Sequence, residues 1–248
     1  MKDIIIFDVD GTLVESSKTI LPVHAEILNK LKEKYTLAIC GGGTKEKILK
    51  QMNEMIVFDH YFSECGCVYH KKDNKNNLIE IYRKNIRNHP FYEKINLLIK
   101  ESLLFFSNVN YTLTGHLIDL RDGLIYISCI GMQANEEERK YFKEYDSIHK
   151  VRETLIDGLK KKAIQLGIYE KINIKEGGTV GIAIYPSEWD KIQILEIITK
   201  KDYNNIIYFG DRFNNDGNDY LILNSAQVIG HKINCVEETY DILRNTYL

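Results

Sequence analysis

Two aspartates follow a short apolar run near the start of the chain. Residues 4–7 are large and apolar, and Asp8, Asp10 and Thr12 come directly after them within Asp-Val-Asp-Gly-Thr. Alternate residues of a strand share a face, so Asp8 and Asp10 are expected to converge just past the strand's carboxyl end, where open α/β sheets bind ligands. Two neighbouring carboxylates repel unless a proton or a metal ion separates them. The pattern therefore predicts a Mg²⁺ site in which one aspartate attacks and the other moves protons.

The same pattern has two other interpretations. Calcium loops also contain Asp-x-Asp-Gly, but they need further oxygen ligands downstream and a closing glutamate, and the sequence after Thr12 lacks them. A plain acidic turn after a strand is the remaining alternative, and the apolar strand with Gly-Thr behind it makes that interpretation the weaker one.

A glycine run marks a second candidate site. Residues 36–40 are apolar, and Gly41, Gly42 and Gly43 separate them from a helical pattern that begins at Thr44. Glycines let backbone N–H groups approach an anion, and the start of a helix adds its dipole. We therefore expect Gly42, Gly43 and Thr44 to bind phosphate, with Thr44 supplying a hydroxyl. Taken alone, the run is equally compatible with a tight turn.

Acidic residues return near the end of the chain. Residues 205–209 predict a buried strand, and Asp211 follows it, with Asp219 in the next acidic loop. We expect Asp211 to complete the Mg²⁺ shell begun by Asp8 and Asp10. Either Asp219 or Asn218 is expected to orient that shell from outside. The first two aspartates, the glycine run, Lys191 at the start of a helical pattern and Asp211 follow one another in the order expected for such a site, and chance is a poor explanation for this order.

The pattern of elements separates both ends of the chain from its middle. Each end alternates short apolar strands with helical patterns, which is typical of a parallel α/β sheet. The middle third has a hairpin at residues 116–130 turned by Asp122-Gly123, and then helical patterns, the first capped by Asn135. We therefore predict an α/β protein in which a Rossmann-like core carries an inserted α+β cap. The predicted division is a core of residues 1–83 and 187–248 and a cap of residues 84–186.

Further elements are expected along the chain from their apolar spacing. They are strands at residues 56–58, 61–68 and 180–185, and helices over 21–34, 85–106 and from 189 through 198.

Composition is that of an ordinary globular protein. The chain has 248 residues, of which 44% are hydrophobic and 27% charged, and its net charge of −2 gives no basic excess for a nucleic-acid partner. No apolar run is long enough for a signal peptide or a membrane span. The five cysteines lack a redox or zinc spacing, which favours reduced thiols. We expect a cytoplasmic protein with neither a nucleic-acid nor a membrane partner.

The apolar strand followed by DxDGT resembles the signature of haloacid dehalogenase-like phosphotransferases. Within that superfamily the chain resembles the eukaryotic-type phosphomannomutases, over nearly its whole length. The segments that carry the resemblance are residues 7–13, 41–42, 120–123, 130–131, 137–139, 177–178, 185–186, 189–191, 209–211 and 217–219. Glu-Glu-Arg at 137–139 and Trp-Asp-Lys at 189–191 are specific to the family rather than to the superfamily.

The resemblance implies interconversion of mannose 1-phosphate and mannose 6-phosphate, with Mg²⁺ and a sugar 1,6-bisphosphate activator. Asp8 would be the phosphorylated nucleophile and Asp10 the general acid/base. Lys191 would offset charge on the transferring phosphoryl group, and Asp211 would bind Mg²⁺. A haloacid dehalogenase-type core with an inserted cap is the implied fold.

The resemblance also implies how the substrate is held. Arg121 and Arg139 on the cap would bind the phosphate that is not transferred, because a guanidinium group binds phosphate through two hydrogen bonds. A homodimer formed through the cap and a role in GDP-mannose biosynthesis are further implications of the family.

Five positions depart from the family pattern. Where that pattern has arginine, serine, arginine, serine and aspartate, this chain has Ser17, Gly43, Met132, Gly181 and Ala183, and the threonine next to Gly43 could replace the serine there. Loss of one bidentate charged contact costs ~1.5–3 kcal/mol, which is about tenfold to a hundredfold in binding. Three hypotheses therefore remain: a phosphomannomutase, a Mg²⁺-dependent phosphatase acting on another small sugar phosphate, and a catalytically silent binding protein.

Overall fold

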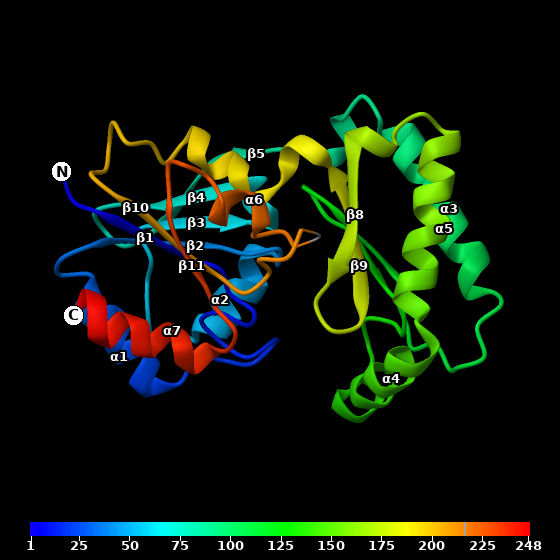
Figure 1. Cartoon of the computed structure of the whole chain (residues 1–248), viewed down its shortest axis with the longest axis horizontal. Helices are drawn as coiled ribbons and strands as arrows, with labels where there is room; N and C mark the ends of the chain where they lie inside the picture. The colour runs from blue at the N-terminus through cyan, green and yellow to red at the C-terminus, as the bar shows by residue number, and fades with distance from the viewer. Residues whose placement is uncertain (216) are drawn as a thin grey trace. The chain divides into compact units, whose positions relative to one another are not determined.

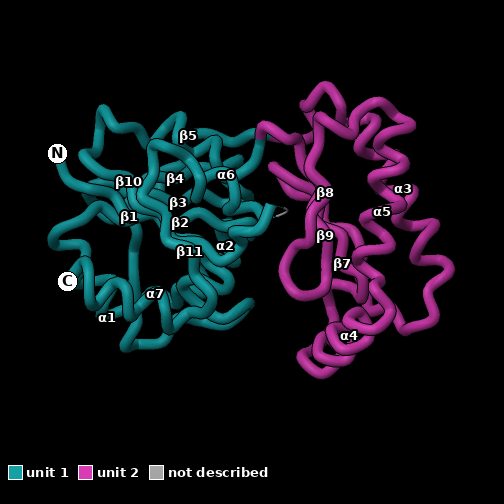
Figure 2. Tube along the Cα trace, viewed as in Figure 1, with its two compact units in different colours: residues 1–84, 189–248 teal, residues 85–188 magenta. Residues whose placement is uncertain are grey.

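The computed structural model describes residues 1–215 and 217–248, and the chain in it divides into two units. Unit 1 contains residues 1–84 and 189–248, and unit 2 contains residues 85–188 (Figure 2). The chain therefore leaves unit 1 once and returns to it once. The first crossing lies one residue and the second two residues after the boundaries expected from the sequence.

Unit 1 is built on a mostly parallel sheet (Figure 1). Its strands among the described residues have the order β11-β10-β1-β2-β3-β4-β5, and β4 and β5 form an antiparallel edge. The strands are β1 (Ile4–Phe7), β2 (Thr36–Cys40), β3 (His60–Ser63), β4 (Val68–Lys72), β5 (Leu78–Arg83), β10 (Ile206–Gly210) and β11 (Ile229–Lys232). The α-helices are α1 (Pro22–Leu31), α2 (Lys45–Met52), α6 (Tyr220–Leu223) and α7 (Val236–Ile242), and two 3₁₀ helices used below are η1 (Glu64–Gly66) and η5 (Lys191–Glu196).

The central strands are apolar on both sides because helices cover both faces of the sheet. In β1, Ile5 and Phe7 pack in the cluster that includes α1, α2 and α7, whereas Ile4 and Ile6 pack in the cluster that includes η5 and α6. All four side chains are completely buried. The core therefore holds β1 rigidly, and the residue that follows it begins from a fixed position.

Unit 2 has an antiparallel sheet with the order β6-β7-β9-β8 in its described residues. Its strands are β6 (Ile118–Leu120), β7 (Ile125–Ser128), β8 (Ile172–Gly177) and β9 (Gly181–Pro186), and its helices are α3 (Tyr92–Phe106), α4 (Glu136–His149) and α5 (Val151–Gln165). Helix α5 packs against α3 and against β8 and β9. The predicted cap of α4 is confirmed: Asn135 and Glu138 form a capping box.

Several predicted elements differ from the structure. Residues 56–58 are not a strand, and β3 begins at His60 instead. The segment after Asp190 is a 3₁₀ helix rather than an α-helix. The hairpin between β6 and β7 is confirmed, but neither Asp122 nor Gly123 has the positive φ expected of the predicted turn, although the Arg121 N–H donates to the Leu124 carbonyl oxygen at 3.0 Å.

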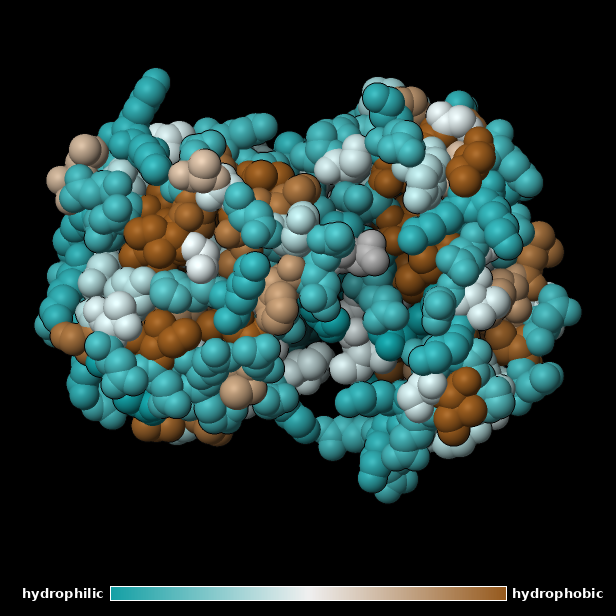
Figure 3. Space-filling view, in the orientation of Figure 1, coloured by the Kyte–Doolittle hydropathy of each residue, from teal (hydrophilic) through white to brown (hydrophobic). Residues whose placement is uncertain are grey.

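The surface is mixed. On the face shown in Figure 3, hydrophilic side chains predominate and the apolar patches are separate, since most large apolar side chains are buried. Within the described residues, none of the helices combines the length and the apolar composition that crossing a membrane requires.

Candidate active site

Three carboxylates meet beside the carboxyl ends of β1 and β10. Asp8 follows β1, Asp211 follows β10, and the two strands are parallel neighbours. Asp219 lies just before α6. One oxygen from each of the three side chains lies within 4.8 Å of the other two. The parallel pairing of β1 with β10 thus brings together carboxylates from opposite ends of the chain.

Lys191 joins this cluster as its cation. Its Nζ lies 2.5 Å from Asp8 Oδ1 and 2.7 Å from Asp219 Oδ1, and its side chain is fully buried. Asp190 positions it, because the Asp190 carboxylate accepts a hydrogen bond from the Lys191 N–H at 2.7 Å and caps η5. The Tyr208 hydroxyl donates to the same oxygen of Asp219 at 2.5 Å. Asp219 Oδ1 is therefore held by both the Lys191 ammonium and the Tyr208 hydroxyl.

Burial dominates the electrostatics of the cluster. Burial raises the pKa of Asp8 well above its usual range, and this effect exceeds the lowering caused by Lys191. Burial, followed by the charge of Asp219, also raises the pKa of Asp211. Burial opposes the charged form of Lys191, but the carboxylates of Asp219 and Asp8 raise its pKa overall. Lys191 is therefore a positively charged ammonium ion, and its single charge does not neutralise all the carboxylates around it.

The residues present fit a divalent cation. If all three carboxylates were ionised beside the one ammonium, the cluster would carry two net negative charges, which Mg²⁺ would balance. Asp211 Oδ1 and Asn218 Oδ1 are buried and have no hydrogen-bond partner among the described residues. Hard oxygen atoms of this kind are the ligands that Mg²⁺ prefers. The neighbouring Asp216 lies outside the described residues.

Gly11 makes room for one of these ligands. Its φ is +90°, and a Cβ atom at this position would lie 2.8 Å from Asp211 Cγ and closer still to Asp211 Oδ2. Only a glycine accommodates both this backbone conformation and the close approach of the carboxylate.

Asp10 has other partners. Its Oδ2 lies 2.5 Å from Lys47 Nζ, and its Oδ1 accepts hydrogen bonds from Gln51 Nε2 and Ser17 N, both at 2.8 Å. Burial would raise the pKa of Asp10, but the Lys47 ammonium and these hydrogen bonds lower it overall. The Asp10 carboxylate is therefore held ionised by groups outside the carboxylate cluster.

The structure differs here from the expected convergence of Asp8 and Asp10, and it does not group the Asp10 carboxylate with the candidate metal ligands. The physical reason is local. Strand β1 ends at Phe7, and the chain turns at Gly11 instead of continuing the alternation of a strand. The period of two no longer applies to the second aspartate.

The glycine run lies between β2 and α2, as predicted. Thr44 caps α2, and its hydroxyl oxygen accepts a hydrogen bond from the Lys47 N–H at 3.3 Å. The carbonyls of Gly41 and Gly43 accept hydrogen bonds from the N–H groups of Cys65 and Glu64, at 2.9 and 3.0 Å. A neighbouring turn therefore braces the loop that contains Gly42.

In unit 2, Arg121 and Arg139 are both anchored. Arg121 Nε lies 2.7 Å from Asp119 Oδ2, and its guanidinium group lies 5.0 Å from the centre of the Tyr126 ring. Arg139 donates to the carbonyl oxygens of Ala134 and Met132 at 2.9 and 3.1 Å. Burial raises the pKa of Tyr126 to about 12, while the charges of Arg121 and Arg139 act to lower it. Both guanidinium groups are therefore held in place by groups of unit 2.

Sequence reasoning missed several residues of the site. Lys47 and Gln51 lie three and seven residues after Thr44, so one face of α2 carries all three, and this spacing was the available signal. Tyr208 carries no comparable pattern. Its contact with Asp219 depends on packing between segments, which the periodicity of one sequence does not reveal.

The fold and the site define the haloacid dehalogenase-like class, in which a Rossmann-like unit carries an insert and an aspartate follows the first strand. Solved structures of similar fold include ATP-bound IMP-nucleotidase from Plasmodium falciparum, with a TM-score of 0.74 and 18% identity over 98% of this chain and 59% of that one. A trehalose-6-phosphate phosphatase related protein has a TM-score of 0.55 and 17% identity, over 98% of this chain and 96% of that one.

Sequence comparison narrows the class to one family. The sequence model described as Eukaryotic phosphomannomutase matches residues 24–248. A phosphomannomutase of Solanum lycopersicum is 31% identical over 95% of this chain and 90% of its own length, and a probable phosphomannomutase of Caenorhabditis elegans is 30% identical over 98% and 95%. The chain belongs to the eukaryotic phosphomannomutase family.

Proposed function

We propose that this protein is a phosphomannomutase that interconverts mannose 1-phosphate and mannose 6-phosphate through a phosphorylated Asp8. The observation that carries the proposal is the buried Lys191 ammonium, which lies between Asp8 and Asp219 beside the partnerless oxygen of Asp211. A family member that keeps this arrangement retains a nucleophile and a cation for the transferred group.

Each step assigns a task to a residue of the chain. With a phosphoryl group on Asp8, the free 6-hydroxyl of mannose 1-phosphate attacks that phosphorus, Asp10 takes the hydroxyl proton, and the bond from phosphorus to Asp8 breaks, which gives a sugar bisphosphate. The freed Asp8 carboxylate then attacks the phosphorus at C1, the bond from that phosphorus to the sugar oxygen breaks, and Asp10 returns the proton to this oxygen, which leaves mannose 6-phosphate and restores phosphorylated Asp8. For this role Asp10 must exchange its contact with Lys47, which now holds it ionised.

Mg²⁺ would be held by Asp8 and Asp211, with Asn218 Oδ1 beside them and Asp219 oriented by Lys191. When bound, it supplies charge that offsets the negative phosphoryl group. Lys191 supplies the same kind of stabilisation from the chain itself. A sugar 1,6-bisphosphate is proposed as the activator, because the cycle begins with a phosphoryl group on Asp8.

Binding of the substrate is assigned to two regions. Gly42, Gly43 and Thr44 would bind the phosphoryl group that is transferred, through backbone N–H groups and a hydroxyl. Arg121 and Arg139 would bind the other phosphate, since guanidinium groups bind phosphate through two hydrogen bonds. A homodimer through unit 2, a cytoplasmic location and a role in GDP-mannose biosynthesis extend the same proposal.

A phosphatase acting on a different small sugar phosphate is the second candidate. It is favoured by Met132, Gly181 and Ala183, which offer neither a charge nor a hydroxyl to a sugar. Gly181 has no room for a side chain, because a Cβ atom there would lie 2.6 Å from the Ile127 carbonyl oxygen and closer to the Tyr126 ring. Water would then replace the second sugar hydroxyl as the attacking group.

Phosphorus-31 NMR separates these functions. The protein is incubated with Mg²⁺, mannose 1-phosphate and a trace of glucose 1,6-bisphosphate, beside an Asp8→Asn control. A mannose 6-phosphate signal that the control lacks supports the mutase. Inorganic phosphate without isomerisation supports the phosphatase, and no change in either sample with this or other sugar phosphates supports a silent binding protein.

A further inference from the structure

The loop that contains Gly42 rests on a turn with an unusual backbone. Glu64, Cys65 and Gly66 form η1, and their φ angles are +52°, +58° and +94°. Left-handed backbone is ordinary for glycine but costs free energy for glutamate and cysteine, so it persists only where the surroundings impose it. Two of these residues donate hydrogen bonds to Gly41 and Gly43, as described above. The strained turn therefore sets the position of the glycine loop.

One buried side chain holds this turn. Gln193 Nε2 donates to the Cys65 carbonyl oxygen at 2.9 Å and lies 3.6 Å from Cys67 Sγ. Contact is close along the whole turn, because a Cβ atom on Gly66 would lie 2.7 Å from Ile194 Cγ2 and 3.3 Å from Gln193 Cγ. The turn thus packs directly on η5, the helix that carries Gln193.

The same glutamine is tied to the catalytic lysine and to a second cation. Gln193 is two residues after Lys191 in η5, and its N–H donates to the Asp190 carbonyl oxygen at 3.0 Å. Its Oε1 accepts a hydrogen bond from Lys84 Nζ at 2.6 Å. Lys84 Nζ also lies 5.6 Å from the centre of the Trp189 ring. Each polar atom of the Gln193 amide group therefore has a partner.

We propose that Gln193 is a positioning residue. It fixes the position of the glycine loop, residues 41–43, relative to Lys191, and Lys84 fixes the orientation of its amide group. The assignment rests on the proposed function of that loop as the phosphate site. It rests also on geometry: one side chain joins η5 to the turn beneath the loop, and both are parts of unit 1.

This network lies where the chain crosses between units. Lys84 is the last residue of unit 1 before the crossing, and Trp189 is the first after the return. The Lys84 N–H also donates to the Cys67 carbonyl oxygen at 2.8 Å. Lys84 is consequently bonded to the residue that follows the turn beneath the glycine loop, and Trp189 contacts this turn through Lys84.

The test compares the full-length protein with Gln193→Glu and Gln193→Leu. The glutamate variant keeps the size of the side chain and an acceptor for Lys84, but it removes the N–H donor to Cys65. The leucine variant removes both contacts. Ser102→Ala is the matched control, because it removes a buried hydrogen bond, from Ser102 to the Leu98 carbonyl oxygen, in unit 2.

Two readouts are measured well below the unfolding temperature. Calorimetry with inorganic phosphate in the presence of Mg²⁺ reports the glycine loop, and turnover of mannose 1-phosphate reports the loop and Lys191 together. We expect both Gln193 variants to bind phosphate about tenfold more weakly and to lose about tenfold to a hundredfold in kcat/KM, with kcat falling as well as KM rising. Ser102→Ala should lower Tm and should leave phosphate affinity and kcat/KM at their wild-type values.

A further pair tests the role of Lys84. Lys84→Arg keeps the donor to Gln193 and should stay within about threefold of the wild-type kcat/KM, whereas Lys84→Met should approach the Gln193→Leu value. Combining Lys84→Met with Gln193→Leu should add little to either change, since the two residues act as one unit.

The outcomes separate this proposal from the proposed function. If wild type binds phosphate but leaves mannose 1-phosphate unchanged, and the Gln193 variants bind phosphate more weakly, the positioning role stands and the mutase assignment falls. Wild-type phosphate affinity and kcat in Gln193→Glu would overturn the positioning role, as would activity lost only in proportion to unfolded protein. Absence of phosphate binding by wild type would overturn it too.

Discussion

Lys191 Nζ lies 2.5 Å from Asp8 Oδ1, and both residues are buried: Lys191 is 0% exposed and Asp8 5%. For an ion pair this buried, the net contribution of the pair to stability is much smaller than the loss of stability when one partner is removed. The pair itself contributes modestly, because burial of both charges is costly, but removing one partner leaves the other uncompensated.

Lys191→Met should therefore affect both stability and activity. We expect the free energy of unfolding to fall by about 3–5 kcal/mol without Mg²⁺, and turnover to fall about a hundredfold or more. Added Mg²⁺ should recover part of the stability, since it offsets the same carboxylates. Urea denaturation with and without Mg²⁺ measures this, with Lys32→Met as the control, because Lys32 is a half-buried lysine bonded to the Val57 carbonyl oxygen. Equal losses in the two variants would argue against a special role for Lys191.

Asp211 gives a direct test of the metal site. Its Oδ1 is buried without a partner among the described residues, so a cation that binds there satisfies it. Mg²⁺ at a hundred times its Kd should raise the free energy of unfolding of wild type by about 2.7 kcal/mol. Asp211→Asn should lose most of that gain. Asp59→Asn, which removes the partner of Lys72, serves as control. If Mg²⁺ stabilised wild type and Asp211→Asn equally, the metal would bind elsewhere.

Acid should destabilise the protein partly through His60. Burial lowers the pKa of His60 to about 4, from an ordinary value of 6.5, and the ring bonds the hydroxyls of Tyr69 and Tyr203. The folded state holds the neutral ring and the unfolded state binds a proton more readily, so this contribution is fully present above about pH 6.5 and is lost as pH falls toward 4.

Between pH 7 and pH 4.5 the loss from this group should be about 2–3 kcal/mol. His60→Gln cannot titrate, and its free energy of unfolding should fall by that much less over the same interval. Chemical denaturation at the two pH values gives the difference. Parallel pH profiles of wild type and variant would show that other groups govern the acid response.

The sequence predicted the parts of the fold that periodicity and chain order control. Strand β1, the start of α2 at Thr44 and the N-cap of α4 at Asn135 depend on neighbouring residues, and all three are confirmed. Strand β1 could be predicted from its continuous apolar run, because a strand that is buried on both faces has apolar residues at every position.

What the sequence did not predict depends on contacts between distant segments. Asp10 lies only two residues after Asp8, yet the turn at Gly11 and the reach of Lys47 from α2 give it different neighbours. Gln193 has no motif around it, and its partners Cys65 and Lys84 are more than a hundred residues away. Such contacts follow from packing, which a period of 2 or 3.6 does not encode.

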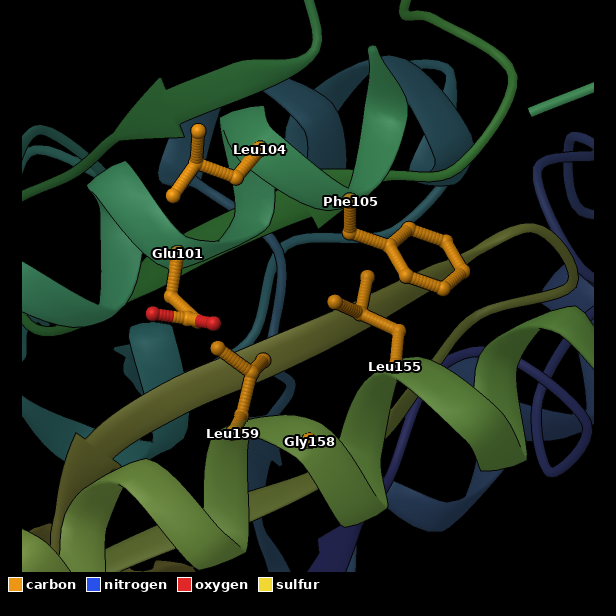
Figure 4. Close-up of a pocket in the computed structure, with 6 residues that line it drawn as sticks. All are labelled: Glu101, Leu104, Phe105, Leu155, Gly158 and Leu159. Carbon is orange, nitrogen blue, oxygen red and sulfur yellow. The ribbon is translucent and has the colours of Figure 1, made fainter. Parts of the chain in front are cut away.

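Gly158 of α5 and Gly167 just after this helix allow backbone entropy to be separated from packing. Gly158 lies inside the helix and lines a groove with Leu155 and Leu159 of α5 and Glu101, Leu104 and Phe105 of α3 (Figure 4). A Cβ atom would have no heavy atom within 4 Å at Gly158, and the same is true of Gly167, which follows the helix with a φ of +66°. Steric room is therefore equal at the two positions, and only backbone conformation differs.

Gly158→Ala should raise the free energy of unfolding by about 0.5–1 kcal/mol, because alanine loses less backbone entropy than glycine inside a helix. Gly167→Ala should lower it by about 1 kcal/mol. Its N–H donates to the Ile164 carbonyl oxygen and the Ile168 N–H to that of Ala163, and this helix end requires the left-handed conformation that alanine disfavours. Urea denaturation of both variants measures the two changes, and neither should alter turnover. Changes of the same sign would mean that the groove, rather than the backbone, controls the response at Gly158.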